Sequence, residues 1–124
     1  MPWLWRQVSN PSAESVAAEI YGKSGWIFGL FGFLISHNAT SAKRYRFELF
    51  RTGTNETRSM FTVTVPANST VYVESDEPLI FGIGAFVGGY KEHLKVVAVD
   101  GGEPTLTIGL KVRGKWFLVT DMYG

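Results

Sequence analysis

The stretch TLTIGLKV, residues 105–112, decides the fold class, because its large apolar side chains fall on every second position. Leu106, Ile108, Leu110 and Val112 alternate there with small or polar residues. That period is typical of a β-strand with one face in a core and the other in water. We therefore predict that all four side chains face the core, since a register shift of one residue would expose them together.

The same alternation occurs in residues 44–50 and 60–65. Further apolar segments, at 26–35, 71–73, 79–87, 94–99 and 116–120, are separated by glycine, proline, asparagine and serine, which favour turns. No long helical pattern lies between them, which argues against a parallel sheet. The sequence predicts an all-β fold: a single antiparallel β-sandwich of about eight strands, jelly-roll-like, although other eight-stranded sandwiches and barrels fit nearly as well.

One short helix is predicted within residues 11–21. Asn10 is a good N-cap and Pro11 suits the first helical position. The apolar residues that follow are spaced one, three and four apart, as a helix face requires, and Gly22 is a suitable C-terminal stop.

Residues 1–9 read as an apolar N-terminal arm, with residues 10–124 as the single sandwich domain. The arm carries Trp3, Leu4, Trp5 and Val8, which we name as the candidate interface. Large apolar side chains should not remain in water, because fully burying one of them is worth about 1.5–3 kcal/mol. Two arrangements stay open: the arm packs on its own domain, or it docks on a neighbouring subunit with the tryptophans as anchors.

Composition limits the classes of partner. Lys and Arg number 12 against 11 Asp and Glu, a formal charge of +1, which argues against nucleic acid or an anionic membrane surface. Cysteine is absent from the chain, which excludes disulfides and thiolate metal sites. The longest apolar run, residues 26–35, is far shorter than the ~20 residues of a membrane-spanning helix, and the N-terminal sequence lacks the pattern of a cleaved signal peptide. We expect neither a membrane-spanning segment nor a signal peptide, and localisation stays otherwise open.

Catalytic motifs are not found in the sequence. His37 and His93 lack the spacing of a metal site and are interpreted as surface histidines. Asp76 and Glu77 are adjacent and are interpreted as part of a turn, and residues 100–103 as a hairpin turn rather than a calcium loop. We expect no enzyme activity, no cofactor and no bound metal.

The leading functional hypothesis is a non-catalytic structural protein, such as a minor capsid or decoration protein of a virion. It would form a homo-oligomer, for example a trimer, or bind another assembly subunit, through the sandwich and the N-terminal arm, and would then be located in the virion. The alternative is a carbohydrate- or ligand-binding β-sandwich module, using exposed aromatic residues such as Tyr90 or Tyr123.

Overall fold

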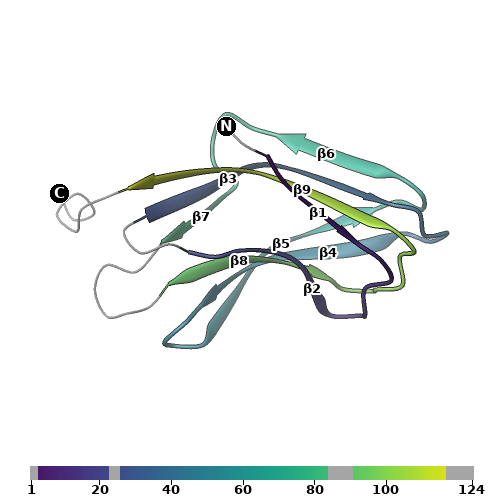
Figure 1. The fold of residues 1–124 in the computed structure, drawn as a ribbon, viewed down its shortest axis with the longest axis horizontal. Helices are drawn as coiled ribbons and strands as arrows, with labels where there is room; N and C mark the ends of the chain where they lie inside the picture. Colours follow the sequence, from purple (N-terminus) through teal and green to yellow (C-terminus); the bar gives the residue numbers. More distant parts are fainter. Residues whose placement is uncertain (1–2, 23–25, 84–90, 117–124) are drawn as a thin grey trace.

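The computed structural model describes residues 3–22, 26–83 and 91–116. Within these ranges the chain forms nine β-strands and no helix (Figure 1). The strands are β1 (Trp3–Val8), β2 (Ser15–Ile20), β3 (Trp26–His37), β4 (Lys43–Arg51), β5 (Glu56–Val65), β6 (Thr70–Glu74), β7 (Ile80–Ile83), β8 (Glu92–Ala98) and β9 (Leu106–Trp116).

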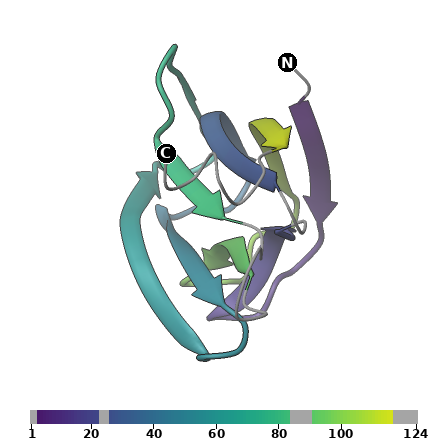
Figure 2. The same cartoon turned by 90° about the vertical axis from the view of Figure 1, so that its left-hand side faces the viewer.

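The strands form two antiparallel sheets that face each other (Figures 1 and 2). One sheet has the order β1-β9-β3-β6, with β7 also paired to β3, and the other has the order β2-β8-β4-β5. The register shows that β6 and β7 follow one another along the same side of β3, at residues 32–36 and 27–30. The predicted all-β architecture with antiparallel sheets is confirmed.

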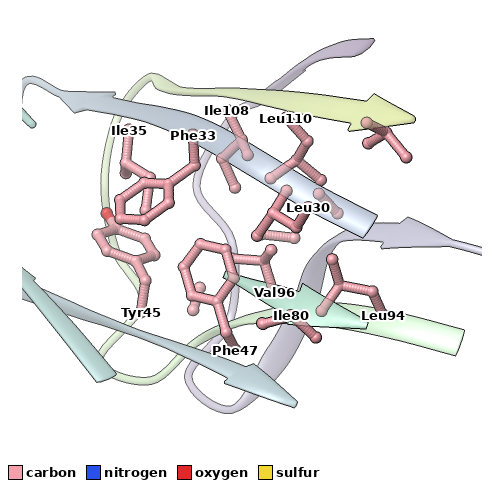
Figure 3. Close-up of a cluster of buried hydrophobic side chains, with 14 of the residues drawn as sticks. Leu30, Phe33, Ile35, Tyr45, Phe47, Ile80, Leu94, Val96, Ile108 and Leu110 are labelled. Atoms are coloured by element: carbon pink, nitrogen blue, oxygen red, sulfur yellow. The ribbon is translucent and has the colours of Figure 1, made fainter. Parts of the chain in front are cut away.

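The core lies between the two sheets (Figure 3). Leu30, Phe33 and Ile35 of β3 face Tyr45 and Phe47 of β4, and all five side chains are buried. The four apolar residues of β9 that the sequence assigns to the core, Leu106, Ile108, Leu110 and Val112, have exposed fractions of 0%, 1%, 3% and 9%. That prediction is confirmed.

The predicted helix within residues 11–21 is wrong, because Ser15–Ile20 form strand β2, paired with β8. The register shifts between Val16 and Ala18, which marks a β-bulge. A bulge adds one residue to a strand and so breaks the strict alternation of its faces. Ala17 and Ala18 are therefore both buried, and their apolar spacing imitates that of a helix.

Glycine marks two other irregular points. The register of β3 with β9 shifts between Leu30 and Gly32, beside one of the two glycines of this strand. The predicted turn at residues 113–115 is wrong, because β9 continues through Trp116 and pairs with β3 along its whole length. A Cβ on Gly114 would lie 3.0 Å from the Trp26 ring, so glycine here gives that ring room beside the strand. The predicted strand segments 84–87 and 117–120 lie outside the described residues.

Candidate functional site: an open edge and an aromatic platform

The four predicted interface residues lie on β1, an edge strand that pairs with β9 of the same chain. Their side chains divide between its two faces. Trp5 is opposite Gly109, a position between the inward-facing Ile108 and Leu110, so Trp3 and Trp5 lie on the outer face of the sheet. Leu4 and Val8 lie on the inner face, where Val8 packs against the core and Leu4 remains 50% exposed.

Leu4 remains exposed because the sandwich is open along this side. A groove of about 420 Å³ lies between the edge strands β1 and β2. Its lining is mixed: the polar residues are Arg6, Gln7 and Glu19, and the apolar ones include Leu4 of β1, Ala18 and Ile20 of β2, and Ile108 and Leu110 of β9. The open edge, which we define as β1 with this groove, therefore combines apolar side chains with a strand that has no second neighbour among the described residues.

The ring of Trp5 lies flat on the outer face of the sheet. A Cβ built on Gly109 would lie 2.4, 2.7 and 2.8 Å from the three nearest ring atoms, Cζ3, Cε3 and Cη2. These nearly equal distances are those of an approach to the face of a ring, because an approach to its edge would leave the two flanking atoms much farther away. Glycine at position 109 thus lets the indole cover the neighbouring strand, and the other side of the Trp5 ring faces solvent, at 59% exposure.

Two more aromatic rings continue this surface across the sheet. The planes of Trp3 and Trp5 are 18° apart, with ring centroids 5.5 Å apart, and those of Trp3 and Tyr72 are 20° apart at 5.8 Å. Tyr72 belongs to β6, and β9 and β3 lie between it and β1. The rings of Trp3, Trp5 and Tyr72 together form what we call the aromatic platform.

Polar groups lie beside the platform. The carboxylate of Glu74 accepts hydrogen bonds from the ammonium of Lys111 and from the hydroxyl of Tyr72. These two donors stabilise the ionised form, which lowers the pKa of Glu74 below its usual value. The hydrogen bond from the Tyr72 hydroxyl to Glu74 raises the pKa of Tyr72, because it stabilises the protonated phenol. The platform is therefore flanked by donors and acceptors whose charges compensate each other.

The two histidines are not surface residues, and that interpretation is wrong. His37 is 4% exposed, with Nε2 donating to the carbonyl of Val65 (3.2 Å) and Nδ1 accepting from the amide of Ala39 (3.0 Å). His93 is 8% exposed, and its Nδ1 accepts from the amide of Gly22 (3.2 Å). Burial lowers the pKa of His93, because it disfavours the charged imidazolium.

Tyr45 and Glu103 form a buried tyrosine–carboxylate pair in the core, separate from the aromatic platform. The hydroxyl of Tyr45 donates to Oε2 of Glu103 at 2.6 Å, and both residues are fully buried. Oε1 of Glu103 has no hydrogen-bond partner among the described residues. Burial, and next the hydrogen bond to Glu103, raise the pKa of Tyr45 far above its usual value.

The segment at residues 100–103 is not a hairpin turn, because it connects β8 to β9 and these strands lie in different sheets. Gly101 and Gly102 have φ angles of +70° and +82°, which favour glycine. Asp100 binds Arg44 through its side chain (2.7 Å) and accepts from its backbone amide (2.9 Å). The two glycines and Asp100 therefore have a structural role in the connection between the two sheets.

Other candidate features can be placed briefly. In the part of the chain that the structure describes, no group of three or more histidine and acidic side chains is arranged to hold a metal ion. Nor do these residues contain a helix long and apolar enough to cross a membrane. Asp76 and Glu77 lie in the bend between β6 and β7, as predicted. Tyr90 and Tyr123 lie outside the described residues.

Sequence reasoning did not identify Tyr72 as a site residue. The alternation of residues 71–73 predicts that Tyr72 faces away from the core, and it is 55% exposed. The alternation predicts that Tyr72 is exposed, but it does not predict which residues lie beside it. Those neighbours depend on the order β1-β9-β3-β6, which arises from pairings between distant segments.

No family model matches this chain. A search of curated proteins also finds no match. Among solved structures, one reported as "CBM4 structure and function" aligns with 93% of this chain and 84% of its own, at a TM-score of 0.38 and 10% identity. The infectious bursal disease virus Gx strain structure aligns with 94% of this chain at a TM-score of 0.31 and 8% identity. The VP2 subviral particle of that virus aligns with 98%, at 0.26 and 9%. This chain covers 34% and 40% of those two viral chains. None of these likenesses identifies a family.

Proposed function

We propose that this protein is a non-catalytic assembly component, in the form of a small virion protein of the minor capsid or decoration kind. With β7 set aside, the orders β1-β9-β3-β6 and β2-β8-β4-β5 match those of a jelly roll, an architecture that serves in viral capsid and lectin domains. A fold alone does not assign a function. The observation that carries the proposal is the open edge at β1.

An unpaired edge strand offers its backbone amides and carbonyls to another chain. Natural proteins usually blunt such an edge with proline, bulges or inward charges. β1 has six residues without proline and a regular register with β9. Its one charged residue, Arg6, is opposite Ile108 and therefore on the inner face, where it lines the groove together with Glu19 of β2. Two other residues of β1, Leu4 and Trp5, are 50% and 59% exposed. An added strand would satisfy the free backbone groups and cover Leu4 together with the groove beside it.

A second copy of this chain fits the edge by two-fold antiparallel pairing of β1 with β1. Opposed residues of such a pair share a face, so Trp5 must meet an outward-facing residue. With Trp5 opposite Trp5 of the second copy, residues 3–7 all pair and Arg6 meets Leu4. Placing Arg6 opposite Arg6 would put like charges together, which is destabilising. Placing Leu4 opposite Leu4 would pair only residues 3–5. The Trp5-centred register is therefore the one we propose.

The proposal is tested by Leu4→Lys, measured by sedimentation velocity over a hundredfold dilution series. A lysine on the inner face of the edge should oppose pairing, and a two-fold interface contains the substitution twice. Truncating an interface anchor costs about 2 kcal/mol or more, so dimerisation should weaken at least roughly thirtyfold. Val16→Lys is the matched control: Val16 is 42% exposed on β2, the edge strand of the other sheet.

The wild-type protein and Val16→Lys should both associate as concentration rises, and Leu4→Lys should not. A wild-type protein that stays monomeric over the whole series would contradict the proposal, as would Leu4→Lys and Val16→Lys sedimenting alike. The absence of catalysis belongs to the same proposal. Hydrolysis of a glycan or ester that depends on His37 or His93 would refute it.

A further inference from the structure

We propose that the aromatic platform binds a neutral polysaccharide chain, with sugar rings stacked on the open faces of Trp5 and Tyr72. The platform lies on the outer face of the sheet, whereas the proposed assembly contact uses the strand edge and the inner face. In the proposed β1–β1 register Trp5 also meets Trp5 of the second copy, so the two sites adjoin, but one chain carries the whole platform and glycan binding does not require the dimer.

The platform is an offset stack of three rings, in which Trp5 and Tyr72 are the more exposed, at 59% and 55%. Trp5 lies flat over Gly109, and the planes of Trp3 and Tyr72 follow with successive tilts of 18° and 20°. The face of a pyranose ring carries axial C–H groups, which pack against the electron-rich face of an aromatic ring. The centroid distances of 5.5 and 5.8 Å are too short for coplanar rings set edge to edge, so each ring overlaps the next, and a sugar would meet the faces of Trp5 and Tyr72 that this offset stack leaves open.

The polar groups beside the platform suit hydroxyl-rich ligands without net charge. Glu74 supplies carboxylate oxygens as acceptors, and Lys111 and the Tyr72 hydroxyl supply donors. The ion pair between Glu74 and Lys111 compensates the charge of this lysine. Single-stranded nucleic acid needs a positively charged groove beside its stacking rings. Here the charge next to the rings is balanced, which favours a sugar chain over a phosphate backbone.

The platform is organised before any ligand arrives. Gly109 holds the space that Trp5 covers, and the Trp3 ring contacts both other rings of the platform. Side chains already fixed in the bound conformation lose little rotamer freedom on binding, so more of the contact energy contributes to affinity.

The test uses the full chain with defined glycans: cellohexaose, mannohexaose and chitohexaose followed by tryptophan fluorescence, and insoluble cellulose and chitin by co-sedimentation. We expect at least one of these probes to bind. Trp5→Ala should then weaken binding at least roughly tenfold, because it removes an aromatic anchor of the contact.

Gly109→Ala is the sharper variant, because it removes no aromatic ring. Its Cβ would collide with the Trp5 ring and lift it off the sheet, and the φ of Gly109 is not in the left-handed range that needs glycine. This variant should also lose affinity while unfolding cooperatively. Phe81→Ala is the matched control, because Phe81 is an aromatic residue, 60% exposed, on β7 of the same sheet and outside the platform.

Binding that weakens in Trp5→Ala and Gly109→Ala but not in Phe81→Ala supports the inference. No binding to any of the five probes overturns it, and so does binding that Gly109→Ala leaves unchanged. A monomeric protein that still binds glycan would refute the assembly proposal and leave this one intact.

Discussion

Tyr45→Phe removes a single hydroxyl from the core and tests whether the buried pair with Glu103 stabilises the fold. In the wild-type chain this hydroxyl donates to Oε2 of Glu103 at 2.6 Å, and both side chains are 0% exposed. Oε1 has no partner among the described residues. The variant therefore leaves a buried carboxyl group that has lost its side-chain donor.

The expected loss of stability follows from that geometry. A hydrogen bond to a charged group contributes about 1.5–3 kcal/mol, and leaving a charged partner buried without it costs at least as much. We expect the free energy of unfolding to fall by about 2–3 kcal/mol. For a chain of this length that corresponds to a decrease in Tm of roughly 10 °C. The phenyl ring itself is unchanged, so no cavity contributes to the loss.

Urea denaturation at pH 7 measures the change, and Tyr72→Phe is its control. Tyr72 also donates to a glutamate, but at the surface, where water replaces the lost partner. Its loss should stay below about 1 kcal/mol. Adding Glu103→Met to Tyr45→Phe should recover most of the stability, because replacing both partners with apolar groups removes the unpaired carboxyl. Equal losses in Tyr45→Phe and Tyr72→Phe would refute the reasoning.

The remaining predictions concern the core and pH. Ile108→Ala should reduce the free energy of unfolding by about 2–5 kcal/mol, whereas Thr107→Ala, on the other face of β9, should change it by no more than about 0.5 kcal/mol; a loss below about 1 kcal/mol for Ile108→Ala would contradict its core position. The pKa of His93 is lower in the folded chain than the 6.5 of a free histidine, so as pH falls the unfolded chain takes up the proton first. The contribution of His93 to stability should therefore be constant above about pH 6.5 and decrease as the pH falls below that value. His93→Asn, which keeps an acceptor for the Gly22 amide, should flatten that profile in urea titrations, and an unchanged slope would refute the assignment.

Strands with strict alternation could be predicted from the sequence alone. In β9 and in the 44–50 part of β4, each second residue is large and apolar, and each was assigned to a strand. The sequence does not predict β2 as a strand, because its bulge places Ala17 and Ala18 together in the core and interrupts the alternation of apolar and polar residues. β1 was read as an arm, since its Trp-Leu-Trp sequence is apolar on both faces.

The candidate site was predictable only in part. The sequence singles out Trp3 and Trp5 as large apolar residues that need cover, but not that Gly109 and Tyr72 complete their surroundings. That neighbourhood arises from the pairing of β1 with β9, and no local pattern encodes it. The histidines were misassigned for a related reason: the backbone groups of Val65, Ala39 and Gly22 that satisfy their rings come from other segments.

The pairing of β1 with β9 also shapes how the chain is made. Synthesis begins at the N-terminus, so Trp3–Val8 leave the ribosome long before Leu106–Trp116, the one strand with which they pair in the described part of the chain. During that interval the two indoles have no glycine-lined strand to lie on. Non-local pairings of this kind slow folding into the range of milliseconds to seconds and prolong the exposure of apolar segments. Until β9 has emerged, the apolar side chains of β1 therefore lack the strand against which they pack in the folded protein.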